Sequence, residues 1–483
     1  MNLATFSLAT VAPAMPEIVL LALVSILLVA HLFFRADEQR LTYGLTLVSL
    51  AGVAALCTVS GGQGPTVTFY GMFVSDTLSQ VLKVATLLTV AATLVLSRSY
   101  LELRGLLTGE FLCLALFGTL GMMVMISAHH FITLFLGLEL MALSQYAMVA
   151  LERDSVRATE AAMKYFVLGA LSSGLLLYGM SMIYGGTGSL ELSRVAHAIE
   201  QGGHNTYALF GLVFVVAGIA FKLGNAPFHM WIPDVYHGAA TPTTIIVGAA
   251  PKIAAFAFII RLLTYGLQGL TADWQPMLVI LVVASIAVGN IIAIAQGNLK
   301  RMLAYSTISH MGFVMMGILA GNEAGYTAAM FYVIVYAIMT LGSFGMILLL
   351  SRAGFEAENI EDFKGLNQRS RWYAFMMLIL MFSLAGIPPA VGFLAKLFVL
   401  NAALDAGYTW LVVYAVLLSV VGAFYYLRIV KLMYMDAPTT EITLDARADT
   451  RWMLSATALA TLILGLIPSP LVEICSRAIA ATM

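Results

Sequence analysis

The stretch Phe221–Trp231, FKLGNAPFHMW, decides how this chain folds, because it places a lysine and two helix breakers inside a long apolar segment. The segment covers residues 205–237 and is longer than one straight membrane crossing requires. Pro227 lacks a backbone donor and Gly224 loosens the turn before it, so carbonyls near Lys222 lose their helical partners. The pattern predicts a discontinuous membrane helix with a lysine beside its break.

A second break follows further along the chain. Residues 372–404 contain AGIPPA at positions 385–390, and two successive prolines do not fit a continuous helix. Lys396 lies two turns beyond them. Discontinuous helices at equivalent places in two halves are typical of transporters built from inverted repeats, with sites near the midplane. The order differs between the halves, because Lys222 precedes its break whereas Lys396 follows its own.

The composition also indicates a membrane protein. Of the 483 residues, 61% are hydrophobic and 10% are charged, whereas about a quarter of a soluble domain is charged. So much apolar surface requires the bilayer as solvent. The net charge of -1 offers no basic face for a nucleic acid. The three cysteines form no CxxC pair, which excludes a cysteine-ligated iron–sulfur cluster and gives no sign of a disulfide framework.

Long apolar stretches predict an all-α membrane protein with fourteen transmembrane helices, of which the seventh and twelfth are broken. Helices 4–8 and 9–13 would form two inverted five-helix repeats. The predicted helices cover residues 14–34, 41–60, 76–97, 109–127, 130–150, 158–184, 205–237, 240–266, 273–296, 300–320, 324–351, 372–404, 408–434 and 450–469. The corresponding parts of the chain are 1–108 (helices 1–3), 109–266 (first repeat), 267–435 (second repeat) and 436–483 (helix 14 and tail).

Positive charge predicts the orientation. Sixteen lysines and arginines lie in the connections after helices 1, 3, 5, 9, 11 and 13, against three on the opposite side, Arg194, Arg261 and Arg477. Because basic connections stay in the cytoplasm, both termini should face away from it. The segment 186–204 is poor in apolar residues and predicts an outside loop or a short surface helix.

The five remaining basic residues lie within predicted spans, and all are lysine: Lys83, Lys164, Lys222, Lys252 and Lys396. Arginine outnumbers lysine sixteen to eight in the whole chain, and structural ion pairing would accept either. Only lysine gives up its proton readily when desolvated. Glu139 is the one acidic residue near the centre of a span. Since ionisable groups at mid-bilayer usually mark ion pathways, these residues predict a proton relay. For Lys83, two turns into its helix, a structural role is equally open.

Histidines give a weaker signal. His229, His237 and His310 lie near spans 7, 8 and 10, where an imidazole can pass protons at neutral pH or serve as a hydrogen-bonded structural residue. No phosphate-binding or dinucleotide-binding glycine motif stands between a strand and a helix, so binding of ATP or NADH by this chain is not indicated.

Residues 222–243, KLGNAPFHMWIPDVYHGAATPT, resemble the antiporter-like membrane subunits of respiratory complex I. Residues 155–179, SVRATEAAMKYFVLGALSSGLLLYG, and 298–312, NLKRMLAYSTISHMG, narrow the resemblance to the subunit N branch of the bacterial enzymes. The related L and M subunits and cation/proton antiporter subunits share the KxxxxPxHxWxPD core but differ around it. The resemblance covers essentially the whole chain and implies the same fourteen-helix fold.

The resemblance also implies roles for matching residues. Glu139 would pair with Lys222, Lys252 would link two half-channels, and Lys396 would end the pathway on helix 12. His310 and Lys300 would lie beyond Lys252, and Lys164 matches a helix-6 lysine, whereas the resemblance assigns no role to Lys83. The expected site residues are Glu139, Lys164, Lys222, Lys252, Lys396, His229, His310 and Lys300.

The function implied is proton translocation within an NADH:quinone oxidoreductase, coupled to electron transfer from NADH to quinone on other subunits. We expect no cofactor, redox centre or metal on this chain. Its partners would be the other membrane and peripheral subunits, the lipid bilayer and protons, in a bacterial inner membrane with both termini periplasmic. The alternative is a cation/proton antiporter subunit of a multisubunit exchanger. A haem-binding cytochrome is disfavoured, because the eight histidines lack a paired ligand pattern across two helices.

Overall fold

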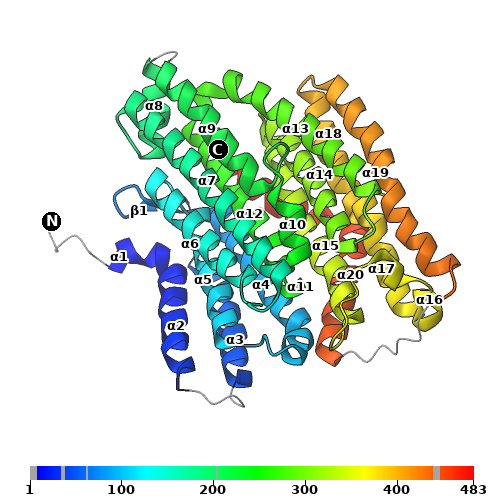
Figure 1. Ribbon diagram of the computed structural model, residues 1–483. Helices are drawn as coiled ribbons and strands as arrows, with labels where there is room; N and C mark the ends of the chain where they lie inside the picture. Colours follow the sequence, from blue (N-terminus) through cyan, green and yellow to red (C-terminus); the bar gives the residue numbers. More distant parts are fainter. Residues whose placement is uncertain (1–7, 34–38, 61–63, 203–204, 439–446, 483) are drawn as a thin grey trace.

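The computed structural model describes residues 8–33, 39–60, 64–202, 205–438 and 447–482, and most of them are helical (Figure 1). Within these ranges twelve helical segments are long and apolar enough to span a membrane, and thirteen if one bent pair near the C-terminus counts as a span. The prediction of an all-α membrane protein is therefore confirmed. The count of fourteen spans stays a prediction, because Arg371–Ala385 is shorter than a straight crossing.

The N-terminal part combines three long helices with a small hairpin. Asp76 begins the third long helix as its N-cap and exchanges hydrogen bonds with Ser79 in a capping box. The hairpin strands pair antiparallel, with Thr66 opposite Ser75. The elements are α1 (Leu8–Val11), η2 (Ala12–Ala14), α2 (Met15–His31), α3 (Gln39–Val59), β1 (Thr66–Thr68), β2 (Phe73–Ser75) and α4 (Thr77–Leu103).

In the described residues of the middle and C-terminal parts, all the named elements are helices joined by short connections. The middle part contains α5 (Gly109–Ile126), α6 (Phe131–Val149), α7 (Val156–Thr187), α8 (Leu192–Gly202), α9 (Thr206–Leu223), α10 (Trp231–Gly238), α11 (Thr241–Gly248), α12 (Ala250–Ile259), η4 (Ile260–Gly266) and η5 (Gln268–Leu270). The C-terminal part contains α13 (Thr271–Ile294), α14 (Leu299–Leu319), α15 (Glu323–Leu350), η6 (Ile360–Phe363), α16 (Leu366–Arg369), α17 (Arg371–Ala385), α18 (Val391–Asp405), α19 (Thr409–Met435), α20 (Ala448–Leu466) and α21 (Ser469–Ala480).

Both predicted breaks are present, and each begins at a glycine in the left-handed conformation. Gly224 ends α9 with a φ of 85° and Gly386 ends α17 with a φ of 84°. Glycine adopts this conformation without the steric penalty that a Cβ atom would add. The chain then needs a short irregular segment before α10 and α18 resume. The carbonyl groups at the ends of α9 and α17 are consequently left open to side chains.

Residues 240–266, predicted as one span, contain a further break that the sequence interpretation missed. α11 stops at Gly248, Ala249 has φ -108° and ψ -76°, and α12 then starts with a proline in its first turn. Pro251 was the available signal, because proline is favoured at the first helical positions and disfavoured inside a helix. The residues that follow Ile259 form a π-helical turn, η4, which carries Arg261.

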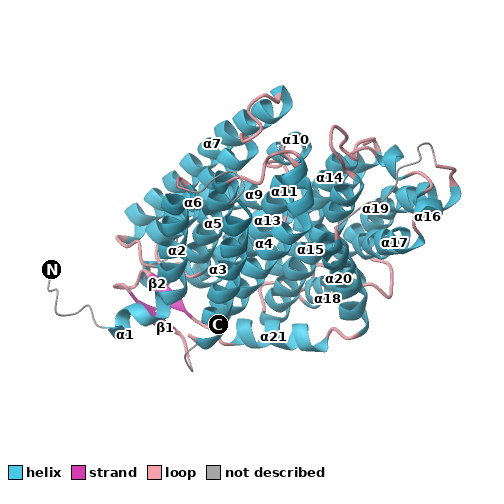
Figure 2. Cartoon of the chain, turned by 90° about the horizontal axis from the view of Figure 1, so that it is seen from below, coloured by secondary structure: helices cyan, strands magenta, loops and turns pink. Residues whose placement is uncertain are grey.

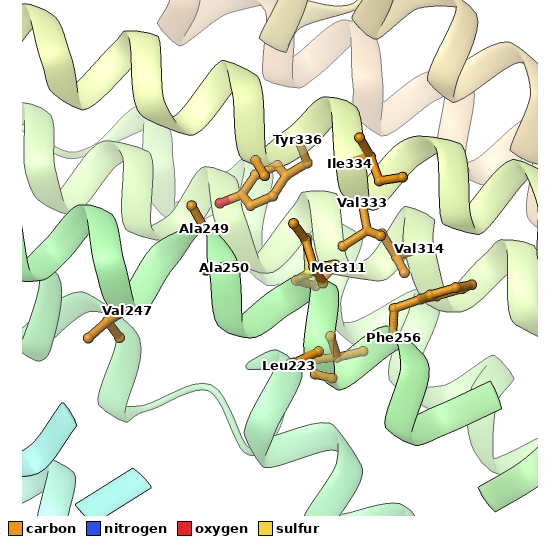
Figure 3. Close-up of a cluster of buried hydrophobic side chains, with 14 of the residues drawn as sticks. Leu223, Val247, Ala249, Ala250, Phe256, Met311, Val314, Val333, Ile334 and Tyr336 are labelled. Carbon is orange, nitrogen blue, oxygen red and sulfur yellow. The ribbon is translucent and has the colours of Figure 1, made fainter. Parts of the chain in front are cut away.

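The centre of the bundle is formed by the span of α11, α12 and η4 together with α14 and α15. Their apolar windows are 100%, 94% and 94% buried within the chain, against 33% for the span of α2 and 28% for α19, which lie at opposite edges (Figure 1). Figure 3 shows Leu223, Phe256, Met311 and Val333 gathered from four helices into this core. Polar groups on α12 and α14 are therefore screened from lipid by other helices.

The two ends of the bundle collect different connections. At one end the basic connections touch: Arg104 pairs with Glu356 and Arg157 pairs with Glu358. At the other end the hairpin contacts Ser127, and α8 forms from the segment predicted as a loop or surface helix. Figure 2 shows α21 lying across one end of the bundle, bent by 80° from α20. The basic connections after spans 3, 5 and 11 thus share one side, as the charge pattern predicted.

Candidate functional site

The ammonium group of Lys252 caps the broken end of α9. Lys252 lies in the first turn of α12 and is fully buried. Its Nζ donates hydrogen bonds to the carbonyl oxygens of Lys222, at 3.2 Å, and Leu223, at 2.8 Å. These carbonyls are available because the helix stops at Gly224. The negative end of a helix dipole favours a cation at this place. The indole of Trp231 lies 5.0 Å from the same Nζ and adds a cation–π contact.

Lys396 caps the other broken helix in the same way. It lies in the second turn of α18, and its Nζ donates to the carbonyl oxygen of Ala385 at 2.8 Å and to Ser419 Oγ at 2.9 Å. Ala385 is the last residue of α17, so this carbonyl too was freed by a break. In the contacts that it makes, Lys396 resembles Lys252 rather than Lys222. Lys252 lies on the span after its break, whereas Lys396 lies on the second half of its own broken span.

Lys300 is a third lysine on a freed helix end. It lies in the first turn of α14, is 2% exposed, and its Nζ donates to the carbonyl oxygen of Ala239 at 2.7 Å. Ala239 follows the last residue of α10. The three ammonium groups are thus each held by a carbonyl where a helix stops. Such a site holds a positive charge yet leaves the lysine able to lose its proton, which an arginine there would not do.

Glu139 and Lys222 are electrostatically coupled but not joined. Lys222 lies in the last turn of α9, and Glu139 near the centre of α6 is the carboxylate that acts on its charge. Within the described residues no hydrogen bond or ion pair connects the two, and Glu139 Oε1 is buried without a hydrogen-bond partner. The predicted partners therefore lie near each other in an open arrangement.

Several other buried polar atoms on α6, on α7 and just after α9 also have no partner among the described protein groups. Buried polar atoms need hydrogen bonds, and internal water supplies them where side chains do not. These atoms come from α6, α7 and the segment after α9: Gln145 Nε2, Tyr146 Oη, Ser172 Oγ, Ser173 Oγ, Asn225 Oδ1 and His229 Nδ1. The half-buried His229 is one of these residues, and among the described residues no hydrogen bond joins it to a lysine.

His310 lies in the middle of α14, 3% exposed, between two tyrosines. Its Nδ1 lies 2.7 Å from the hydroxyl of Tyr332 on α15, and its Nε2 lies 3.2 Å from that of Tyr426 on α19. Ser306 lies 2.5 Å from the Tyr426 hydroxyl and extends the chain of polar groups. The charge of Lys396 acts on His310. Sequence reasoning singled out the histidine but missed the tyrosines, because aromatic residues in apolar spans are ordinarily core.

Lys164 is placed apart from the other expected residues. Its side chain is 43% exposed, and its Nζ pairs with Glu160 and with Asp234, both at 2.8 Å. Arg301 binds the other oxygen of Asp234 at 2.9 Å. Lys164 therefore belongs to an ion-pair cluster on α7, α10 and α14 and does not contact the lysines that cap helix ends.

Two buried ion pairs were not foreseen as pairs. Lys83 Nζ lies 2.5 Å from Glu17 Oε1, with the side chains 3% and 7% exposed. Arg261 binds both oxygens of Asp76, at 2.7 and 2.8 Å. Burial works against the charge of Asp76, but the Arg261 charge and hydrogen bonds from Arg261 and Ser79 outweigh it, so the pKa of Asp76 lies below its usual value. A lysine and an acid on separate helices gave no signal of their proximity.

Within the described residues no group of three or more histidine, cysteine, aspartate or glutamate side chains is arranged to hold a metal ion. The expectation that the chain carries no cofactor stays a prediction.

The chain matches known proteins over nearly its whole length. The family model described as NADH:quinone oxidoreductase/Mrp antiporter, TM, covers residues 128–422. NADH-quinone oxidoreductase subunit N from Thiobacillus denitrificans is 61% identical over 474 residues, 98% of each chain. The subunit N of Nitrosomonas europaea is 57% identical over 480 residues, 99% of this chain and 100% of the relative.

Solved structures include chains with a similar fold. A chain of respiratory complex I from Thermus thermophilus with bound aureothin has a TM-score of 0.83 at 30% identity, covering 95% of this chain and 99% of that one. A chain of the Mrp complex from Dietzia sp. has a TM-score of 0.83 at 21% identity, covering 98% of this chain and 97% of that one, and shares the fold. The similarities agree with the broken helices and the lysines that cap them, and the chain belongs to the antiporter-like membrane subunits of NADH-quinone oxidoreductases, in the subunit N branch.

Proposed function

We propose that this chain translocates protons across the membrane as one subunit of an NADH-quinone oxidoreductase, with oxidation of NADH and reduction of quinone on other subunits. The observation that carries the proposal is the placement of Lys252, Lys300 and Lys396 on carbonyls freed where helices stop. Buried lysines arranged this way suit groups that gain and lose a proton. The subunit N relatives supply the assembly in which such a pathway would work.

Proton movement follows from interactions between neighbouring charges. Lys222 and Lys252 repel each other when both are protonated, while Glu139 attracts the proton on Lys222. When Glu139 closes on Lys222 it stabilises the ammonium there. When it withdraws, the buried charge loses its partner, and a proton is driven onward past Lys252 toward His310. Because these groups interact, they gain and lose protons as a coupled set, and no single titration step can be assigned to one lysine.

The pathway would end at Lys396. Repulsion between a protonated His310 and the Lys396 ammonium links these two groups as it links Lys222 and Lys252. Moving one charge against the membrane potential requires about 2.3 kcal/mol per 100 mV. With oxidation of NADH and reduction of quinone on other subunits, that free energy would reach this chain through its contacts with them.

The finer features of the fold belong to the same proposal. The twelfth span would combine α17 and α18, which together with the α20–α21 pair gives fourteen. Inverted repeats over 109–266 and 267–435, preceded by helices 1–3 and followed by 436–483, are supported by the matching cap of Lys252 on α9 and Lys396 on α17. The basic connections at one end of the bundle support a bacterial inner-membrane orientation with both termini periplasmic.

The test is proton uptake in vesicles that contain the assembled enzyme. Lys222→Ala and Glu139→Ala should both lower NADH-driven translocation strongly, because each removes one partner of a coupled buried pair. Lys431→Ala is the matched control, since that lysine is 64% exposed and lies near the C-terminal end of α19. Normal uptake by both variants would contradict the proposal. Sodium-dependent exchange without NADH oxidation would favour the antiporter function, which the likeness to the Mrp chain keeps as the second candidate.

A further inference from the structure

The segment between α15 and α17 covers the place where α10 gives way to α11. Its backbone is fastened to the start of α14: the amide of Leu299 donates to the Glu358 carbonyl at 2.6 Å, and the amide of Ile360 donates to the Gly297 carbonyl at 3.0 Å. Lys300 directly follows Leu299. The segment therefore lies over the buried lysine that caps α10.

Glu356 of this segment reaches the start of α11. The hydroxyl of Thr241, the first residue of α11, donates to Glu356 Oε1. The other oxygen accepts from the Tyr100 hydroxyl at 2.8 Å and pairs with Arg104 at 2.6 Å. The Glu356 side chain is 15% exposed, so one carboxylate both contacts the helix start and reaches the aqueous phase.

Glu356 and Lys300 meet the same short connection. Lys300 binds the carbonyl of Ala239, and Glu356 binds the side chain of Thr241 two residues further on. The Glu356 carboxylate also acts electrostatically on the Lys300 ammonium. Lys300 itself is 2% exposed, whereas the Glu356 side chain is 15% exposed, so of the two groups the carboxylate is the more accessible from outside the bundle.

We propose that Glu356 passes protons between the aqueous phase and Lys300, and so forms the port of the pathway at the end of the bundle where the basic connections meet. The inference rests on the proposed function. The carboxylate gains a proton from the aqueous phase and becomes a carboxylic acid. The acid then gives this proton to the neutral amine of Lys300. A carboxylate and an ammonium result, and no electron moves.

The neighbouring acids fit other roles. Glu358 is bound by both terminal nitrogens of Arg157, at 2.9 and 3.3 Å, and fastens the segment to α7. Glu361 is 61% exposed and pairs with Lys364 of its own segment. The charged and titratable groups that face Glu356 and Lys300 from the surrounding elements are Tyr100, Arg104, Glu152, Arg157, His237, Arg301 and Glu358.

The experiment compares Glu356→Gln with the wild type in NADH-driven proton translocation by vesicles of the assembled enzyme. The amide keeps an oxygen that accepts hydrogen bonds but cannot carry a proton. At about pH 8 we expect the rate to fall by about tenfold, since a positioned proton carrier ordinarily contributes about that much or more. At about pH 6 the proton concentration is about 100-fold higher, so direct protonation of Lys300 from water should restore most of the rate relative to wild type.

Three further variants separate proton transfer from fastening. Glu356→Asp keeps a titratable group and should retain most of the rate at both pH values. Arg104→Gln removes the ion pair but leaves the carboxylate, and Glu361→Gln removes an equal charge from the same segment. Both should translocate near the wild-type rate. If Glu356→Gln assembles poorly, Glu356→Asp and Arg104→Gln still separate proton transfer from fastening, because the first keeps a titratable group and the second removes only the ion pair.

The inference is overturned if Glu356→Gln translocates normally at about pH 8, if its loss persists at about pH 6, or if Arg104→Gln loses as much. Lys222→Ala distinguishes this failure from failure of the proposed function. If Lys222→Ala is impaired at both pH values while Glu356→Gln is normal, only the role of Glu356 as the port is contradicted. If Lys222→Ala translocates protons normally, the proposed proton pathway itself is contradicted.

Discussion

Lysine holds each of the three sites where a side chain caps the end of a helix, although arginine is twice as frequent in the chain. An arginine would bind the same carbonyls with more donors and would never lose its charge. The choice of lysine therefore follows from a need to release a proton and not from a need for charge alone. Lys396 offers the sharpest test, because its ammonium is held by one carbonyl and one hydroxyl.

Lys396→Arg should abolish most proton translocation per NADH oxidised, almost as Lys396→Ala does, because a guanidinium with a pKa above about 12 stays charged through the cycle. The measurement uses vesicles with equal amounts of assembled complex. Lys431→Arg, at an exposed position near the C-terminal end of α19, is the control and should be neutral. A Lys396→Arg enzyme that pumps near the wild-type ratio would leave this lysine a structural charge.

Asp76 gives a prediction for pH. Its pKa is below the usual value, so the charged carboxylate stabilises the fold at pH values above about 4, the unfolded-state pKa. This stabilisation disappears as the pH falls through the folded-state pKa. The thermal midpoint in detergent should therefore drop on acidification in the wild type. Asp76→Asn should lie well below wild type near neutral pH and approach it at low pH. Parallel curves at all pH values would contradict the assignment.

At the scale of elements, the breaks depend on single glycines beside the lysines that use them. A Cβ atom at Gly386 would lie 2.9 Å from Lys396 Cδ, and Gly386 has a φ of 84°. Gly224 has the same conformation next to Lys252. A helix stop and a capping lysine thus form one unit, in which the backbone conformation frees the carbonyl and the absent side chain leaves room for the ammonium.

The ion pair between Glu17 and Lys83 fastens α2 to α4. Glu17→Ala should destabilise the chain by about 3–5 kcal/mol, because it leaves a buried ammonium without its partner. The double variant Glu17→Leu/Lys83→Met should recover most of that loss, since apolar side chains of similar volume often replace a buried pair without penalty. Thermal unfolding in detergent measures both. A double variant as unstable as the single one would show that the pair does more than hold two helices together.

At the scale of the whole molecule, the orientation can be tested by cysteine labelling. The three native cysteines are buried, so they give little background. Gly64→Cys, before the hairpin, and Lys364→Cys, after α15, should react from opposite sides of the membrane, with position 364 cytoplasmic. Reaction of both from one side would show that the helix count between them is wrong.

The sequence by itself determined the membrane class, most of the spans and the two glycine–proline breaks. Apolar length, charge asymmetry and backbone chemistry are local properties, so they can be read along the chain. It also singled out Lys222, Lys252, Lys396 and Glu139, because an ionisable group inside an apolar span is conspicuous whatever its neighbours are.

Only the tertiary structure decided which groups meet. Lys252 lies on the end of α9 and Lys300 on the end of α10, while Lys164 pairs with Asp234 away from them. Glu356, in a connection rich in charge, looked like any solvated acid until the fold placed it on Thr241. Contacts between distant positions depend on how helices pack, and helix packing depends on the shapes of many side chains at once. No local pattern encodes that.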